Sequence, residues 1–474
     1  MTHPQPPSHA YMQPSTPKFS YIDDGEDVEL LADDELYSEV MECGVPLLDI
    51  ATAMARGYMK GNPLAVMSKM IGTAACDAPS AAIPTGIGSR PAPLNLMFCL
   101  VGPSGVGKGT SLDAPIVVAS PMGGYRITTP ASGEALINSF FEQVPAADGR
   151  GSETVRHTDP VWVSWGEIDA FAAKSSSTAS TLDAHMRSLF TGERVGDESI
   201  TRLKSGVGCI LDPASYRFVM YVGAQPDHAG VLLDDETGGT LQRLMWLPIL
   251  DEDAPEDLTE AKSYRVSLAH MLGVPVTSTE TSSPNVAVWG PKDGFTVDED
   301  ILRVMVKRRS SILRGETVVN PLDTHIDNLR IRLALIFAAW IAGRGNPAHI
   351  GKEAWWWACC LVEVSRRTRQ YCMEAADHKR KRTAKDAGRT DAERFMAREE
   401  EIARAERRKT ENLRDKIVDR MRDRKQMKHR ELQNAVTNSS NRKQFQAAVQ
   451  MAVDGGDIQE LTDGRSHYYN YTGK

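Results

Sequence analysis

Residues 94–110 read LNLMFCLVGPSGVGKGT, an apolar run followed at once by a glycine-rich loop. A continuous apolar run is typical of a β-strand that is buried on both faces of a parallel sheet. The loop holds four glycines around one lysine, Lys108. Glycines let the backbone turn tightly, so that successive N–H groups point inward at a bound anion. The stretch therefore predicts an α/β fold with a phosphate-binding loop.

The loop fits the P-loop pattern G-x-x-x-x-G-K-[S/T], in which the lysine reaches the β- and γ-phosphates of a nucleotide. Gly109 departs from this pattern, because a serine or threonine normally stands there and binds magnesium. Thr110 is the expected substitute for binding Mg²⁺, with Ser111 behind it. The residues predicted to bind ATP are Gly102, Pro103, Ser104, Gly105, Val106, Gly107, Lys108, Gly109, Thr110 and Ser111.

Further apolar runs follow the loop, with helical stretches between several of them. The runs lie at 115–119, 161–165, 216–224 and 244–250. This alternation predicts a largely parallel sheet, and with the loop it predicts a P-loop NTPase core over residues 90–260.

Acidic residues follow the second of these runs, where Gly166 and Glu167 are succeeded by Asp169. Motor ATPases usually place two acids here, one on the magnesium shell and one that polarises the attacking water. We predict that Glu167 orients the water and is catalytic together with Lys108. Asp169 is then the candidate for the metal shell. The alternative interpretation is an acidic surface turn.

Two polar residues flank the later runs. Gln225 directly follows the third run and is a candidate sensor of the γ-phosphate, or else part of a plain turn. Arg243 directly precedes the last run. We predict that Arg243 is catalytic and stabilises transition-state charge at the γ-phosphate of a neighbouring subunit. Arg194 and Arg202 are alternatives for this role.

The segments outside the core differ in composition. Residues 1–43 are predicted to be disordered and acidic, and residues 44–89 to be helical. Residues 261–374 are predicted to form an irregular segment and then a helical subdomain, in which the tryptophans at 355–357 are more often core than a stacking surface for nucleic acid. Residues 375–412 mix both charge signs without an apolar seam, which predicts a charged helical linker.

Residues 413–474 form a further unit with three helical stretches and then IQELTDGRSHYYNYT at 458–472, which is typical of a two-strand hairpin. This order predicts a winged helix-turn-helix, whose third helix enters the major groove of DNA. A protein-docking module of the same fold is the alternative. The predicted DNA contacts are Asn441, Arg442, Lys443 and Gln444 on the third helix and Arg465 on the wing.

Charge is distributed unevenly along the 474 residues. Residues 366–474 hold 27 Lys and Arg against 18 Asp and Glu, whereas the other residues hold 28 against 45. A basic tail on an acidic body suggests that the tail binds nucleic acid, the alternative being a solvated charged helix. No apolar stretch is long enough to span a membrane, so no membrane partner is expected. The seven scattered cysteines form no CxxC motif, which favours reduced thiols in the cytoplasm.

Six segments in this order resemble a family of phage and prophage P-loop proteins that accompany primase–helicase replication systems. They are GPSGVGKGT at 102–110, TPASGEAL at 129–136, VWVSWGEIDAF at 161–171, LFTGERVGDESITR at 189–202, YVGAQPDHAGVLL at 221–233 and TGGTLQRLMWLP at 237–248. The resemblance implies a DNA-acting, helicase-like motor or helicase loader, assembled as a homo-oligomeric ring with ATP between subunits. It also implies replication partners such as a primase, helicase or polymerase, and the cytoplasm of a bacterium or phage-infected host. Glu134 is expected near the nucleotide or DNA.

Two other functions remain open at this point. The departures at Gly109 and Gly166 concern hydrolysis more than binding, so an ATP-responsive origin-binding initiator or regulator with little unwinding activity is the main alternative. A small-molecule nucleotide kinase is suggested by the GKGT sequence alone, but the predicted winged helix and the basic linker argue against it.

Overall fold

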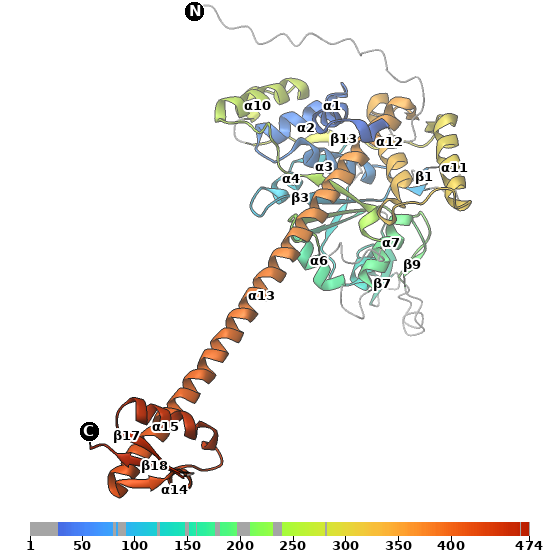
Figure 1. The fold of residues 1–474 in the computed structure, drawn as a ribbon. Helices are drawn as coiled ribbons and strands as arrows, with labels where there is room; N and C mark the ends of the chain where they lie inside the picture. Colours follow the sequence, from blue (N-terminus) through green and yellow to red (C-terminus); the bar gives the residue numbers. More distant parts are fainter. Residues whose placement is uncertain are drawn as a thin grey trace, which may run out of the picture. The chain divides into compact units, whose positions relative to one another are not determined.

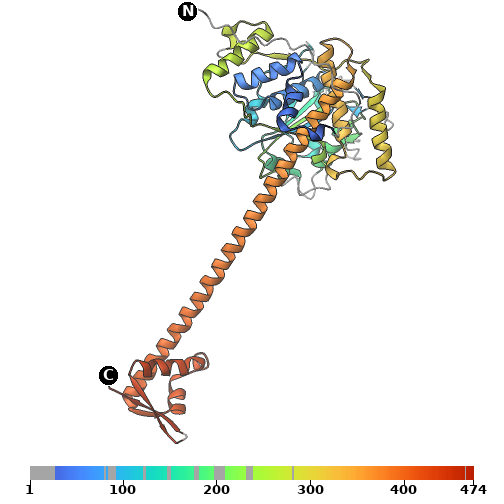
Figure 2. The same cartoon turned by 45° about the horizontal axis from the view of Figure 1, so that its top comes forward.

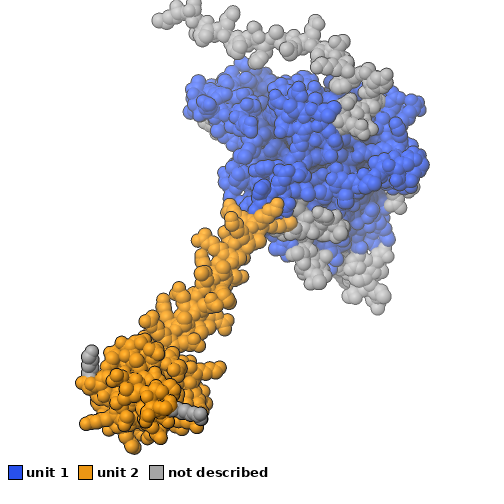
Figure 3. All heavy atoms as spheres, in the orientation of Figure 1, with its two compact units in different colours: residues 1–379 blue, residues 380–474 orange. Residues whose placement is uncertain are grey.

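The protein forms two compact units, residues 1–379 and residues 380–474 (Figure 3). No helix in the described part of the chain is long and apolar enough to cross a membrane. The computed structural model describes residues 27–78, 82–83, 92–120, 124–146, 151–157, 159–175, 181–196, 209–230, 239–279, 282–464 and 466–473.

The first unit is built on a five-stranded parallel sheet, as predicted. Its strands lie in the order β12-β3-β11-β8-β5, so that β11 separates β3 from β8. Every described residue of β3 and β11 is buried, as expected of central strands covered on both faces. The bounds are β3 Leu96–Val101, β5 Arg126–Thr128, β8 Val161–Trp165, β11 Phe218–Ala224 and β12 Leu244–Pro248.

The apolar run at 115–119 does not belong to this sheet, contrary to our prediction. It forms β4, Ile116–Val118, which pairs with β13, Val286–Val288, in a separate two-stranded sheet. Val117 is 42% exposed, so this run is buried on one side only. The fifth strand of the sheet is β5, which is half-exposed at the edge of the sheet and is not part of an apolar run in the sequence.

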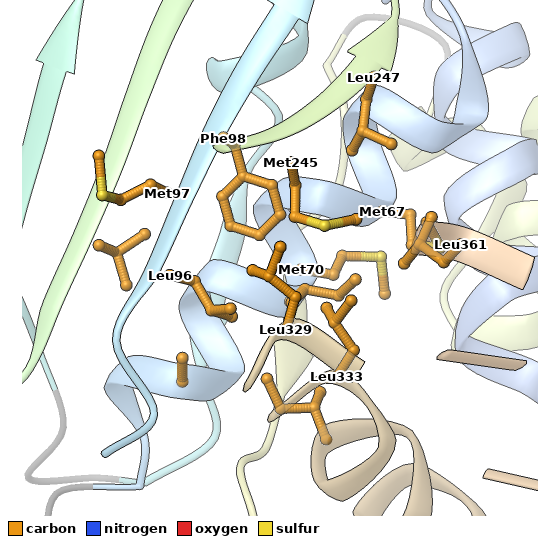
Figure 4. Packing of buried hydrophobic residues seen from close by; sticks show 14 of the residues in the cluster. Met67, Met70, Leu96, Met97, Phe98, Met245, Leu247, Leu329, Leu333 and Leu361 are labelled. Carbon is orange, nitrogen blue, oxygen red and sulfur yellow. The ribbon is translucent and has the colours of Figure 1, made fainter. Parts of the chain in front are cut away.

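The N-terminal helices share the apolar core that covers the sheet. Helix α3, Pro63–Cys76, is buried almost throughout and packs on β3, β11 and β12. Figure 4 shows Met67 and Met70 of α3 meeting Phe98 of β3, together with side chains from α12, Ile326–Ala342, and from α13, Lys352–Arg424. In Figure 1, helices α6 and α7 lie on the opposite side of the sheet from α3.

The segment after the core is more regular than predicted. It contains α10, Leu258–Leu272, which lies beside α2, Pro46–Gly57, in both views of the fold (Figures 1 and 2). Polar groups hold this contact, because Arg265 donates to the Gly57 carbonyl at 2.6 Å. Only three residues of α10 are buried, so the helix has almost no apolar pattern by which the sequence could reveal it.

Most of the remaining described elements of the first unit have ten residues or fewer. The helices are η1 Asp27–Leu30, α1 Asp33–Met41, α4 Lys108–Leu112, α5 Gly133–Asn138, α6 Ile168–Ser175, α7 Leu182–Thr191, η2 Leu241–Arg243, η3 Val276–Thr279, α11 Glu299–Leu313 and η4 Pro321–Asp323. The strands are β1 Ala82–Ile83, β2 Ala92–Pro93, β6 Phe141–Pro145, β7 Ser152–Arg156, β9 Val195–Gly196, β10 Ile210–Leu211, β14 Thr296–Val297 and β15 His349–Ile350.

Helix α13 is one continuous helix of 73 residues and includes the predicted linker. Every residue from 377 to 409 is exposed, so no packing stabilises this part. Ion pairs one turn apart do so instead, such as Arg389 with Glu393 at 3.1 Å and Arg407 with Glu411 at 3.3 Å.

The second unit folds around its own apolar core, which includes Leu413, Phe445 and Tyr469. Its sheet has three antiparallel strands in the order β16-β18-β17. The predicted hairpin is present as β17 and β18, and β16 adds a strand that the sequence reading missed because it is only three residues long. The elements after α13 are β16 Gln426–Lys428, α14 His429–Val436, η5 Arg442–Gln444, α15 Phe445–Asp454, β17 Ile458–Asp463 and β18 Ser466–Tyr471.

Candidate functional site

The glycine-rich loop connects the carboxyl end of β3 to α4. Gly105 and Gly107 have φ angles of +82° and +90°, a region that favours glycine. Gly102 is required for a different reason, since a side chain there would overlap Ile249 after β12. The loop conformation is therefore set by the glycines that the P-loop pattern contains.

Lys108 is buried at the start of α4 and folds back over the loop. Its Nζ donates to the carbonyl oxygens of Gly102 and Pro103, both at 2.9 Å. A Cβ at Gly223 of β11 would lie 3.2 Å from Lys108 Cε and would overlap the Gly166 carbonyl oxygen. Because Gly223 has no side chain, Lys108 can lie next to Gly166 at the carboxyl end of β8, directly before the predicted acid Glu167.

Glu167 comes after β8 and Gly166, and its Oε2 atom is buried without a hydrogen-bond partner among the described residues. A buried carboxylate oxygen that accepts no hydrogen bond is costly.

The hydroxyl residues after Lys108 differ in their surroundings. Thr110 is exposed and its Oγ1 donates to the Gly107 carbonyl at 2.7 Å. Ser111 is fully buried and its hydroxyl donates to the Lys60 carbonyl, so it supports the loop from behind. Gly109 has open space around it. Thr110 is therefore better placed than Ser111 to bind magnesium.

Gln225 lies between the loop and Glu167, because β11 separates β3 from β8. Side-chain contacts hold the turn after Gln225 on two sides. His228 Nδ1 lies 3.0 Å from Asp169 Oδ2 at the start of α6, and Lys379 Nζ lies 3.1 Å from Asp227 Oδ2. Although burial opposes it, the hydrogen bond and charge of Lys379 hold the pKa of Asp227 below its ordinary value.

Asp169 is less suited to the metal shell than predicted. Its carboxylate is exposed and engaged by His228, a residue that the sequence reading did not single out. The described residues contain no cluster of three His, Cys, Asp or Glu side chains that could hold a metal ion.

Arg243 lies at the amino end of the parallel strands, whereas the loop lies at their carboxyl end. It directly precedes β12, and the five residues of this strand span about 16 Å between the two ends. Its guanidinium donates to the Gly239 carbonyl and lies 5.9 Å from the centre of the Phe190 ring. Burial and the neighbouring Arg187 lower the pKa of Arg243 to about 10. Arg243 therefore cannot contact a nucleotide in its own loop.

A buried arginine that the sequence did not reveal lies beside Arg243. Arg332 is 2% exposed, and its guanidinium stacks 4.1 Å from the centre of the Phe190 ring. Burial lowers the pKa of Arg332 to about 9. Among the rival arginines, Arg194 is exposed after α7, and Arg202 lies outside the described residues.

The predicted DNA-contacting residues form η5 and its cap, one turn before α15. Arg442 and Lys443 are exposed, whereas Asn441 and Gln444 are half-buried. Asn441 is partly committed to the fold, since its side chain accepts from the Asn438 N–H at 2.8 Å. Arg465 lies outside the described residues. Glu134 is exposed in the first turn of α5, in the chain segment after β5.

A substitution at Gly223 tests this geometry without any ligand. We expect Gly223→Ala to lower the free energy of unfolding by about 1–3 kcal/mol, since the new methyl group must displace β8 or Lys108. The matched change Gly109→Ser meets open space and should leave stability unchanged or slightly higher, because serine is the better helix former. Thermal unfolding of the two variants checks this, and equal stability would contradict the described packing.

The chain matches no model of a known protein family, and no curated protein sequence is significantly similar to it.

Proposed function

We propose that this protein is a DNA-acting P-loop ATPase of phage or mobile-element replication, working as a helicase-like motor or a helicase loader. The observation that carries the proposal is the buried, unpartnered Oε2 of Glu167 at the same sheet edge as Lys108 and the glycine loop. A structural carboxylate would be expected to have a donor. ATP hydrolysis by the full chain that DNA accelerates is the test of this function.

The residues act as follows in this proposal. The loop N–H groups and Lys108 hold the β- and γ-phosphates, which compete with the Gly102 and Pro103 carbonyls for the lysine. Glu167 accepts a hydrogen bond from a water molecule and orients it in line with the γ-phosphorus, and Gln225 contacts the γ-phosphate from β11. A magnesium ion, when bound through Thr110, neutralises phosphate charge. The phosphoryl group passes to water, giving ADP and inorganic phosphate.

Assembly into a homo-oligomer completes this site. Arg243 is about 16 Å of strand away from its own loop, so a catalytic role would require the nucleotide of a neighbouring subunit. An arginine supplied in this way stabilises the charge of the phosphoryl-transfer transition state. Burial against Phe190 makes Arg243 less mobile than an exposed arginine, which favours a fixed position. We propose a ring with ATP between subunits.

The second unit is proposed to be a winged helix that binds DNA. Its order of helix, strand, two helices and hairpin, with a three-stranded sheet, is compatible with that fold. Exposed Arg442 and Lys443 precede α15, the proposed recognition helix. Lys428 on β16 adds a cation 5.7 Å from the centre of the Tyr468 ring on the hairpin.

The double change Arg442→Ala/Lys443→Ala is expected to weaken duplex DNA binding by tenfold or more at physiological salt. Each lost phosphate contact should also reduce the slope of log affinity against log salt by about 1. ATP affinity should not change, because both residues belong to the second unit. Fluorescence anisotropy over a salt series measures this, with Lys307→Ala/Arg309→Ala on α11 as the control. Unchanged DNA affinity would indicate a protein-docking module.

An ATP-responsive origin-binding initiator or regulator is the second candidate. Gly166 stands before Glu167 where motors carry an acid, and Asp169, the other acid of this turn, is paired with His228. These features favour tight binding with slow hydrolysis.

A further inference from the structure

The three-stranded sheet of the second unit turns one face toward solvent. Met427, Tyr469 and Ile458 belong to the apolar core of this unit. Because side chains alternate along a strand, the residues next to them point to the opposite face, which we call the outer face. The outer face carries two rows of side chains across β16, β18 and β17, with Lys428, Tyr468 and Leu461 in one row and Gln426, Asn470 and Gln459 in the other. All six are exposed or half-buried.

Tyr468 lies at the centre of the first row, between a cation and an apolar side chain. Lys428 Nζ is 5.7 Å from the centre of the Tyr468 ring, and Leu461 is 38% exposed. This distance is near the upper limit for a cation–π contact, so the lysine can turn toward a phosphate at little cost. An accessible aromatic ring beside a lysine is an arrangement by which proteins stack a base and neutralise its phosphate.

The second row consists of three amides. Gln426, Asn470 and Gln459 each have an oxygen that accepts and an amino group that donates hydrogen bonds, as the polar edges of bases do. The Asn470 Oδ1 atom is buried without a hydrogen-bond partner among the described residues, so contacts within the fold do not saturate this row. Within the described strands, Asp463 at the hairpin tip is the one carboxylate on the outer face. Little negative charge therefore opposes a phosphate there.

Positive charge is concentrated where the sheet meets the end of α13. Residues 422–430 hold five Lys and Arg against one Asp, and all five cations are exposed. Arg422 pairs with Asp419 at 3.4 Å, whereas the other four form no ion pair with a described residue. Lys425 has a φ of +61°, and its carbonyl accepts from the Tyr471 N–H at 2.9 Å. This hydrogen bond fixes the basic segment beside β18.

A flat sheet face with one accessible ring suits a single strand better than a duplex. In a duplex each base is stacked between its neighbours and presents only its edges in the grooves, whereas an unpaired base can lie against the ring of Tyr468. We propose that the outer face binds single-stranded DNA, with an unpaired base on Tyr468 and Lys428 on a neighbouring phosphate. This inference goes beyond the proposed function, because neither the glycine loop nor Arg442 and Lys443 takes part in it.

Fluorescence anisotropy of the full chain with a labelled single strand of about 12 nucleotides tests the inference. Tyr468→Ala should weaken binding by about tenfold, whereas Tyr468→Phe keeps the ring and should bind as the wild type does. Lys428→Ala should reduce the slope of log affinity against log salt by about 0.7. His467→Ala is the matched control, since His467 is exposed on the same strand but points to the other face. Ultraviolet cross-links of an iodouracil-containing strand, mapped by mass spectrometry, are expected at Tyr468.

The outcomes separate this inference from the proposed function. Normal single-strand affinity in a folded Tyr468→Ala protein would overturn the inference, and so would an equal loss of duplex affinity. If the wild type binds duplex DNA and hydrolyses ATP but does not bind the single strand, the inference is wrong and the proposed function stands. Single-strand binding that depends on Tyr468, in a protein without ATPase activity, would support the inference and contradict the motor. Circular dichroism verifies that each variant is folded.

Discussion

Lys108→Ala is expected to reduce ATP affinity by about 100-fold or more. The change removes the main counter-charge of the β- and γ-phosphates, and charge-assisted hydrogen bonds of this kind are worth about 1.5–3 kcal/mol each. Lys108 is 8% exposed, so water does not replace the lost contact easily. Calorimetric titration with ATP and Mg²⁺ measures the effect.

Two controls accompany the Lys108 variant. Lys262→Ala removes an exposed lysine on α10 and should leave ATP affinity unchanged. Thermal unfolding shows how much stability the loop loses, since the Lys108 amine also donates to the carbonyls of Gly102 and Pro103. Normal ATP affinity in a folded Lys108→Ala protein would contradict the assignment of the phosphate loop.

Glu167→Gln is expected to separate hydrolysis from binding. The amide has nearly the same shape but cannot draw a proton from water, and general-base catalysis typically contributes 10²–10⁴-fold to the rate. We therefore expect turnover to fall by about 100-fold or more while ATP affinity stays close to that of the wild type. Single-turnover hydrolysis, combined with a binding titration, resolves the two effects.

Asp169→Asn is the matched control for Glu167→Gln. Asp169 lies two residues further on, is exposed and pairs with His228 at 3.0 Å, so its loss should reduce turnover only modestly. If Asp169→Asn abolished turnover and Glu167→Gln did not, the roles of the two carboxylates would be exchanged.

The elements that the sequence predicted best are those formed by consecutive apolar residues. The strands β3, β8, β11 and β12 follow from continuous apolar runs, and the loop follows from its glycines, because parallel central strands are covered on both faces. Strand β5 and helix α10 have no such pattern, since each is exposed on a wide side. The partner of β4 is a non-local property, and an apolar run alone does not specify it.

The site likewise contains some residues that the local sequence predicts and some contacts that it does not. Lys108 and Glu167 could be predicted from their places after a strand. The contacts of Lys60 with α4 and of His228 with Asp169 join residues far apart in sequence, about which local spacing carries no information. Gly223 is similar, because its lack of a side chain matters only where β11 passes Gly166 and Lys108.

Steady-state ATP hydrolysis by the full chain, with and without single-stranded and double-stranded DNA, decides whether this protein is a DNA-dependent ATPase. We expect turnover that DNA stimulates and that Glu167→Gln lowers by about 100-fold or more. Tight ATP binding with negligible turnover under every condition would contradict a motor and favour the ATP-responsive initiator. Absence of ATP binding would contradict the nucleotide site itself.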